Sequence, residues 1–112
     1  MSKVLVTGAS GLLGTEICRQ LKDSNKYTVY ALDNHSRSSS IPPNDYWIEA
    51  DLRNPETLNN LGFEWDFIYH YSAINGTTNF YERPNEVLTN NFLSDVAIFE
   101  FAERCPNLKK LV

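Results

Sequence analysis

Three glycines spaced three residues apart, Gly8, Gly11 and Gly14, form the pattern in this chain that is most suggestive of chemistry. They follow an apolar, strand-like run at residues 4–6, and the apolar spacing of a helix begins directly after them. A glycine turn between a strand and a helix allows the free N–H groups of the first helical turn to point at an anion. The pattern therefore predicts a site for the phosphates of a nucleotide.

The three glycines have separate expected roles in such a site. Gly8 allows the tight turn, Gly11 lets a pyrophosphate approach backbone N–H groups, and Gly14 lets the helix pack closely on the sheet. The residues between them that are also expected to contact the cofactor are Ser10, Leu12 and Leu13. The alternative interpretation is that the glycines serve only to form tight turns.

An acidic residue, Asp33, ends the next strand-like run, 19 residues after Gly14. A carboxylate at this position accepts hydrogen bonds from the ribose hydroxyls of an adenosine and repels a 2′-phosphate. Arg37 follows shortly afterwards, and an arginine there can pair with a 2′-phosphate. We predict NAD as the cofactor, with NADP as the less favoured choice; the competing interpretation is that Asp33 is a solvated loop acid.

The elements that must position these residues alternate between strand and helix patterns. Strands are expected at residues 3–7, 27–32, 46–50, within 65–71 and from 109 onward, and helices at 11–22, 55–61 and 84–104. This alternation predicts one α/β domain, residues 1–112, with a Rossmann-type, three-layer, doubly wound parallel sheet. The expected strand order is 3-2-1-4-5, with the fifth strand truncated. Nucleotides bind such sheets where the order reverses, at the carboxyl ends of the strands.

A second acid, Asp51, follows the third expected strand and precedes Leu52. In this topology the end of that strand borders the adenine pocket. We expect Asp51 to accept a hydrogen bond from the adenine amino group and Leu52 to cover the ring. The alternative is that Asp51 merely terminates the strand.

The composition is that of an ordinary globular chain, with 42% hydrophobic and 21% charged residues among 112. A net charge of −4 argues against a nucleic acid or an anionic membrane as a partner. No apolar run reaches the roughly 20 residues of a membrane span, and the strand-like start leaves no room for a signal peptide. Cys18 and Cys105 suit neither a disulfide framework nor a metal site, so we expect packing residues and a cytoplasmic protein.

Taken in order, the motifs resemble those of the extended short-chain dehydrogenase/reductases, in particular the NAD-dependent epimerase/dehydratase group that acts on nucleotide sugars. Residues 7–14 resemble the family motif TGxxGxxG. Residues 33–34 resemble its ribose-binding Asp-Asn, and residues 51–53 resemble its adenine-side Asp-Leu-Arg. The resemblance implies a nicotinamide dinucleotide as cofactor and a nucleotide sugar as substrate of the full-length parent.

Two further stretches carry the resemblance into the second half of the chain. Residues 66–73 resemble the fourth-strand pattern D-x-V-x-H-L-A-A, and Asn91 with residues 99–102 resembles the helix pattern N-x-x-G-T-x-N-L-L-E-A-A. The cofactor contacts that the resemblance adds to those above are Asn34, Tyr71, Ser72, Ala73 and Asn91.

Four residues depart from the pattern of the family. Tyr71 and Ser72 stand where Leu and Ala are usual beside the cofactor, which we expect to alter contact with its nicotinamide half. Ser94 and Asp95 replace the Gly-Thr pair of the long helix, which we expect to affect mainly helix packing. Residues 73–84 resemble, in part, the substrate-side loop of the family, with a surface turn as the alternative.

The sequence lacks the catalytic tyrosine–lysine pair that the resemblance implies. The family uses a tyrosine as general base with a lysine four residues later, whose ammonium group lowers the tyrosine pKa. No tyrosine of this sequence has a lysine at that spacing, and His70 is expected to be a hydrogen-bonded core residue. We therefore expect no catalytic residue, and the NAD(P)-binding portion of a nucleotide-sugar epimerase, dehydratase or reductase. The alternatives are a non-catalytic nucleotide-binding or interaction module of Rossmann type and a flavodoxin-like domain.

The long helix expected at residues 84–104 is apolar on more than one face. One stripe consists of Leu88, Phe92, Val96 and Phe99, and another of Val87, Ile98 and Phe101. Because one face of a sheet cannot cover both stripes, we expect a homo-oligomer. The resemblance has the same implication, since this helix belongs to a four-helix dimer interface in that family.

Overall fold

The computed structural model of the chain describes residues 1–34, 40–72 and 81–112. Its strands are β1 (Ser2–Thr7), β2 (Tyr27–Asp33), β3 (Tyr46–Glu49), β4 (Phe67–His70) and β5 (Lys110–Leu111). Its helices are α1 (Leu12–Asp23), α2 (Pro55–Asn59) and α4 (Pro84–Glu103).

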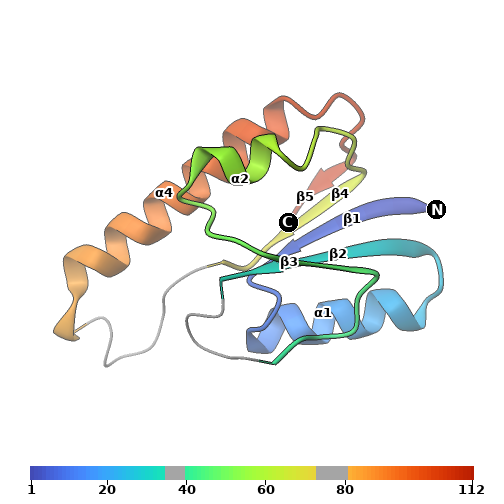
Figure 1. The fold of residues 1–112 in the computed structure, drawn as a ribbon, viewed down its shortest axis with the longest axis horizontal. Coiled ribbons are helices and arrows are strands. Elements are labelled where there is room, and N and C mark those ends of the chain that lie inside the picture. The colour runs from blue at the N-terminus through green and yellow to red at the C-terminus, as the bar shows by residue number, and fades with distance from the viewer. Residues whose placement is uncertain (35–39, 73–80) are drawn as a thin grey trace.

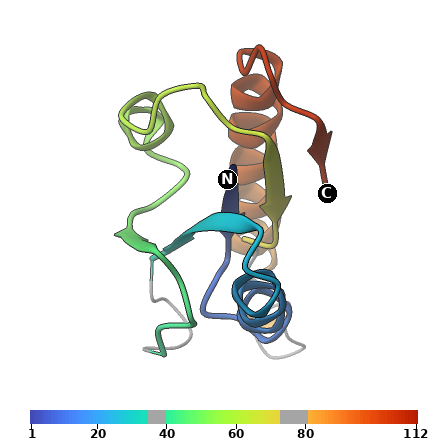
Figure 2. The same cartoon turned by 90° about the vertical axis from the view of Figure 1, so that its right-hand side faces the viewer.

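The five strands form one parallel sheet in the order β3-β2-β1-β4-β5, which confirms the predicted topology. Figure 1 shows α1 on one face of the sheet and α2 and α4 on the other. In Figure 2, turned by 90°, the same three layers are visible, with β3 and β5 at opposite edges. The amino-terminal half of α4 extends past the carboxyl ends of the strands (Figure 1).

The central strand β1 is apolar on both sides because helices cover both faces of the sheet. Leu5 faces the α2/α4 side, where it packs with Ile68 and Ile98 in one cluster of buried residues. Val4 and Val6 belong to the other cluster, on the α1 side. Alternation along a strand thus divides the core into two layers with β1 between them.

The observed ends of most elements differ from the predicted ones by one or two residues. The largest difference is in α2, which ends at Asn59 and not at Leu61. There the chain tightens into i→i+3 bonds, with the N–H of Leu61 donating to Leu58 O at 3.1 Å and that of Gly62 donating to Asn59 O at 3.4 Å. Gly62 then adopts a φ of +76°, which ends the helical path.

Helix α4 carries both predicted apolar faces. Val87, Ile98 and Phe101 are buried, whereas Val96 is half-buried. The large apolar side chains exposed on this helix are Leu88, Phe92, Leu93 and Phe99, each between 44% and 67% accessible. The prediction of an apolar face that the sheet does not cover is therefore confirmed. Within the described residues, no helix has the length and apolar character needed to cross a membrane.

Both cysteines are buried and free, as expected of packing residues. Cys18 lies in the α1-side cluster, and burial raises the pKa of its thiol to about 12. A thiol in the unfolded chain ionises near pH 8.5, so from about pH 9 upward the unfolded state binds fewer protons than the folded state. We therefore expect the free energy of unfolding to fall as the pH rises from about 9 towards 12.

The prediction for Cys18 is checked by urea denaturation at about pH 7.5 and about pH 10.5. The loss of stability between these pH values is expected to be smaller in Cys18→Ala than in the unmodified chain. An equal loss in both would show that this thiol does not carry the dependence.

Candidate functional site

The turn after β1 requires a glycine at its first position. Gly8 has a φ of +64°, a backbone conformation that other residues rarely adopt. A Cβ atom at Gly8 would lie 2.7 Å from the Ser72 nitrogen and closer still to the carbonyl oxygen of Tyr71. Gly8 therefore permits both the turn and the close approach of the segment that follows β4.

Gly14 allows the first turn of α1 to pack closely, but against the turn itself. A Cβ atom there would lie 2.8 Å from Cα of Ala9 and closer still to the carbonyl oxygen of Gly8. Gly14 was expected to let the helix pack closely on the sheet, whereas the close contact that the structure shows is with the backbone of residues 8–9, in the turn that follows β1.

Gly11 differs from these two glycines because the fold has little need of it. Its φ of −74° and ψ of 176° are open to any residue, and among the described residues a Cβ atom would meet only the Gly8 oxygen, at 3.3 Å. Gly11 is the N-cap of α1 and offers no side chain to its N–H groups. The absence of a side chain here leaves the amino terminus of the helix open to a ligand.

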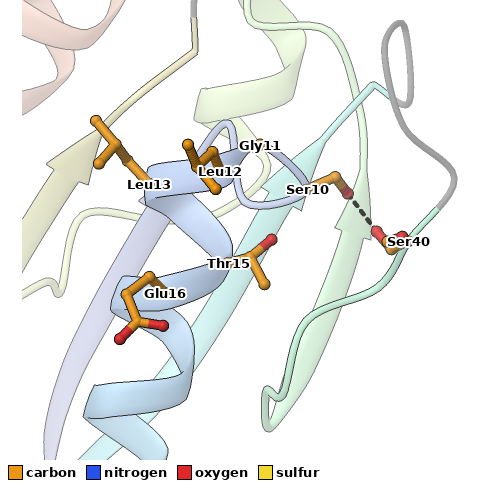
Figure 3. Close-up of a pocket in the computed structure, with 7 residues that line it drawn as sticks. All are labelled: Ser10, Gly11, Leu12, Leu13, Thr15, Glu16 and Ser40. Carbon is orange, nitrogen blue, oxygen red and sulfur yellow. Dashed lines mark hydrogen bonds between the residues drawn. The ribbon is translucent and has the colours of Figure 1, made fainter.

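A cavity of about 550 Å³ lies at this helix terminus (Figure 3). Ser10, Gly11, Leu12, Leu13, Thr15, Glu16 and Ser40 line it. Leu12 and Leu13 are 90% and 63% exposed, so these leucines do not belong to the core. The Ser10 hydroxyl donates to the Ser40 carbonyl oxygen at 2.6 Å, which fixes one wall. The volume falls in the range usual for small-molecule sites.

The amino end of α1 gives the cavity a favourable potential for an anion. The first N–H groups of a helix have no acceptor within the helix, and they carry its partial positive charge. No acidic residue lies in the first turn of α1. Glu16, further along, is paired with Arg19, and the hydrogen bond from Arg19 lowers the pKa of Glu16 to about 2. The negative charge of Glu16 is therefore offset by its neighbour.

Asp33 lies directly beside the glycine turn, although 23 residues separate it from Ser10. The backbone N–H of Ser10 donates to Asp33 Oδ2 at 3.0 Å, and that of Ala9 donates to the carbonyl oxygen of Leu32 at 3.1 Å. The end of β2 is thereby fixed against the turn that follows β1. Asn34 is exposed next to it, and Arg37 lies outside the described residues.

Asp51 follows β3, and Arg53 holds its carboxylate. Arg53 Nη2 lies 2.6 Å from Asp51 Oδ2, and Arg53 Nε donates to both carboxylate oxygens at 3.1 Å. These hydrogen bonds keep the pKa of Asp51 below its usual value, so the group is charged at neutral pH. Arg53 also donates through Nη1 to Asn90 Oδ1 and so connects this loop to α4.

Leu52 points into the protein. Its side chain is 4% exposed and packs with Leu58 and Trp65 in the cluster on the α2/α4 side. Little of the Leu52 side chain is therefore available to cover an adenine ring, the role expected from the sequence. The place of Asp51 directly after the third strand did not indicate on which side Leu52 lies, because the chain leaves β3 at Glu49, before it reaches either residue.

The segment after β4 is held against the glycine turn by Thr7. The N–H groups of Tyr71 and Ser72 donate to Thr7 Oγ1 at 3.1 and 3.3 Å. The Tyr71 ring stacks with that of Tyr69, with 6.4 Å between their centroids. Tyr71 and Ser72 thus lie beside Gly8, whereas Ala73 and the rest of residues 73–80 lie outside the described residues. Asn91 is half-buried on α4.

His70 is hydrogen-bonded at both ring nitrogens, as predicted for a core histidine. Nδ1 lies 2.7 Å from Thr7 Oγ1, and Nε2 lies 2.8 Å from Asp95 Oδ1. Sequence analysis did not foresee the contact with Asp95, or the part that Ser40 plays in lining the cavity. Both contacts join residues that are far apart in the sequence, so no local motif predicts them.

A model of the NAD dependent epimerase/dehydratase family matches residues 4–112. A UDP-glucose 4-epimerase of Pisum sativum is 27% identical over 98% of this chain. Among solved structures, an epimerase of Methanothermobacter thermautotrophicus aligns with a TM-score of 0.87 at 25% identity, over 98% of this chain and 34% of its own. A UDP-glucose 4-epimerase of Thermus thermophilus in complex with NAD aligns with a TM-score of 0.85 at 25% identity, over 97% of this chain and 36% of its own.

The chain spans about a third of the length of these relatives, 35% in the case of the pea enzyme. The family match itself extends over almost the whole chain, from the first residues of β1 to Val112. The matched residues include the glycine turn, Asp33 and Asp51. The chain belongs to the NAD dependent epimerase/dehydratase family.

Proposed function

We propose that this chain is the NAD-binding portion of a nucleotide-sugar epimerase, dehydratase or reductase. The observation that carries the proposal is the contact between the Ser10 N–H and Asp33 Oδ2 at 3.0 Å. It brings a carboxylate that is suited to a ribose to the open amino terminus of α1, which supports the proposal together with the cavity of about 550 Å³ beside it. The Thermus thermophilus relative was solved with NAD, which supports the same choice of cofactor.

In this proposal the pyrophosphate lies against the backbone of Gly11, Leu12 and Leu13, which line the cavity at the amino terminus of α1. Asp33 accepts hydrogen bonds from the adenosine ribose with Asn34 next to it. The charged Asp51 carboxylate accepts from the adenine amino group, and the half of the cofactor that supplies hydride transfer lies towards Tyr71, Ser72 and Asn91.

The chain is not proposed to catalyse by itself. None of its six tyrosines is followed by a lysine at the fourth position, and His70 is engaged at both nitrogens. We propose that the nucleotide sugar is bound by the full-length parent, as the name of the pea relative suggests for its own substrate. The contribution of the present residues is to hold and orient the cofactor.

Calorimetric titration tests the proposal with the 112-residue chain. NAD is expected to bind with a sub-millimolar dissociation constant, and NADP at least about tenfold more weakly, because Asp33 repels a 2′-phosphate. Asp33→Asn keeps an oxygen that can accept from the Ser10 N–H but removes the charge, so it should weaken NAD binding and reduce the discrimination against NADP. No heat with NAD up to about 1 mM in a folded sample would refute the proposal, and a preference for flavin mononucleotide would favour a flavodoxin-like function.

We further propose that the chain forms a homo-oligomer through the exposed face of α4. The exposure of Leu88, Phe92, Leu93 and Phe99 supports this, since such a contiguous apolar face is unusual on a monomer. Sedimentation at about 50 μM is expected to show more than the monomer mass, with the oligomer dissociating on dilution. Phe92→Asp should raise the dissociation constant at least about tenfold, whereas Glu100→Gln on the same helix should not. A single monomer species in the unmodified chain would contradict the proposal.

A further inference from the structure

A row of hydrogen bonds connects helix α4 to the segment beside the glycine turn. It begins at Asp95 Oδ1, which lies 2.8 Å from His70 Nε2 at the end of β4. His70 Nδ1 lies 2.7 Å from Thr7 Oγ1 at the end of β1, and Thr7 Oγ1 accepts from the N–H groups of Tyr71 and Ser72. The His70 side chain of β4 therefore connects β1 to α4, although the three elements are distant in the sequence.

The hydrogen atoms in this row can be assigned by counting. A threonine hydroxyl has one hydrogen and two lone pairs, and the two backbone N–H groups already donate to Thr7 Oγ1. The hydroxyl hydrogen of Thr7 is therefore directed at His70 Nδ1, which must be unprotonated. The imidazole hydrogen then lies on Nε2 and is donated to Asp95 Oδ1.

Asp95, on helix α4 outside the sheet, favours the same tautomer of His70. A carboxylate can only accept, so it requires a donor at His70 Nε2. The His70 side chain is 10% exposed and that of Asp95 is 52% exposed, so the acid reaches a mostly buried ring from the surface. Asp95 is also one of the residues at which this chain departs from the family pattern, in which threonine stands at this place.

We propose that Asp95 is a positioning residue of the dinucleotide site: through the His70 tautomer it sets the Thr7 hydroxyl as a double acceptor that holds the Tyr71 and Ser72 N–H groups beside Gly8. This inference rests on the proposed function. The segment it positions forms the wall of the glycine turn so closely that a single methyl group at Gly8 would overlap it. A shift at residues 71–72 therefore displaces the turn that holds the phosphates.

The Ser72 amide is the most sensitive reporter of the row. The Tyr71 N–H also donates to the carbonyl oxygen of Thr7 at 3.1 Å, so it keeps one acceptor if the hydroxyl moves. The bond from Ser72 to Thr7 Oγ1 is long, at 3.3 Å, and depends on the hydroxyl alone among the bonds seen in the described residues. Loss of the Asp95 acceptor should therefore be detected first at Ser72.

The test compares three variants of the 112-residue chain. Asp95→Leu removes the acceptor, Asp95→Asn retains an oxygen that can accept from His70 Nε2, and Glu100→Leu is a matched control at an exposed acid of the same helix. The measurements are NAD affinity by calorimetry, hydrogen exchange of the Ser72 amide, and the ring ¹⁵N shifts of His70. These shifts report the tautomer directly, and they and the amide exchange are measured without NAD.

In Asp95→Leu we expect NAD affinity to fall and Ser72 exchange to rise, each about 2- to 10-fold, the effect of losing one hydrogen bond of typical net strength. The unmodified chain should show the Nε2–H tautomer, and Asp95→Asn and Glu100→Leu should resemble it in all three measurements. If NAD binds the unmodified chain and Asp95→Leu equally, the positioning role is overturned while the proposed function stands. An Nδ1–H tautomer or an imidazolium of His70 in the unmodified chain would overturn the hydrogen assignment and the positioning role. If neither the unmodified chain nor any variant bound NAD, both the proposed function and the positioning role would be overturned.

Discussion

Gly8→Ala is expected to lower the free energy of unfolding by about 4 kcal/mol or more, and to prevent folding if the chain is less stable than that. A non-glycine residue at a φ of +64° costs about 1–2 kcal/mol by itself. The larger part comes from overlap, because the new methyl group would lie 2.7 Å from the Ser72 nitrogen and closer to the Tyr71 oxygen. Both atoms belong to the peptide group between Tyr71 and Ser72, whose N–H donates to Thr7 Oγ1, so neither can rotate away as a side chain would. Urea denaturation measures the effect.

Gly62→Ala is the matched control for this prediction. Gly62 also has a positive φ, +76°, but a Cβ atom there would meet no atom within 4 Å in the part of the chain that the structure describes. Gly62→Ala should therefore lower the free energy of unfolding only by the cost of the backbone conformation, about 1–2 kcal/mol. Equal losses for Gly8→Ala and Gly62→Ala would show that the close approach of the Tyr71–Ser72 segment is not what requires Gly8.

Gly11→Ala is expected to separate binding from stability. The fold has nearly enough room for the methyl group, whose nearest neighbour would be the Gly8 oxygen at 3.3 Å, so the cost in stability should be about 1 kcal/mol or less. The methyl group would however occupy the approach to the helix N–H groups in the cavity. NAD affinity should fall at least about tenfold, which corresponds to about 1.4 kcal/mol.

Calorimetry and urea denaturation on the same preparation check both parts of the Gly11 prediction. Gly62→Ala serves again as the control, since it adds the same methyl group away from the residues that line the cavity. It should leave the dissociation constant for NAD unchanged. Undiminished NAD binding by Gly11→Ala would place the pyrophosphate elsewhere.

The sheet was predictable from the sequence because its signals are local. The apolar run at residues 4–6 and the strand formers at residues 27–32 mark buried parallel strands, and right-handed crossovers then permit few strand orders. The glycine spacing and the position of Asp33 predicted that the glycine turn and this acid would lie close together. The hydrogen bond from the Ser10 N–H to Asp33 Oδ2 confirms it. Even the two faces of α4 could be anticipated from the spacing of its apolar residues.

What could not be predicted depends on tertiary contacts of irregular segments. The orientation of Leu52 is set by packing against Trp65 in the core, and not by the period of the preceding strand. Asp95 was expected to matter mainly for helix packing, yet it contacts a histidine 25 residues earlier in the chain. The link from Arg53 to Asn90 likewise spans 37 residues. Such pairs leave no periodic trace, so a single sequence does not reveal them.

The most direct measurement is the change in backbone ¹⁵N–¹H shifts when NAD is titrated into the labelled chain. The largest changes are predicted at Ser10, Gly11, Leu12 and Leu13, with further changes at Asp33, because the diphosphate and ribose are held there. Saturable changes confined to other parts of the chain, or none at all in a folded sample, would contradict the account.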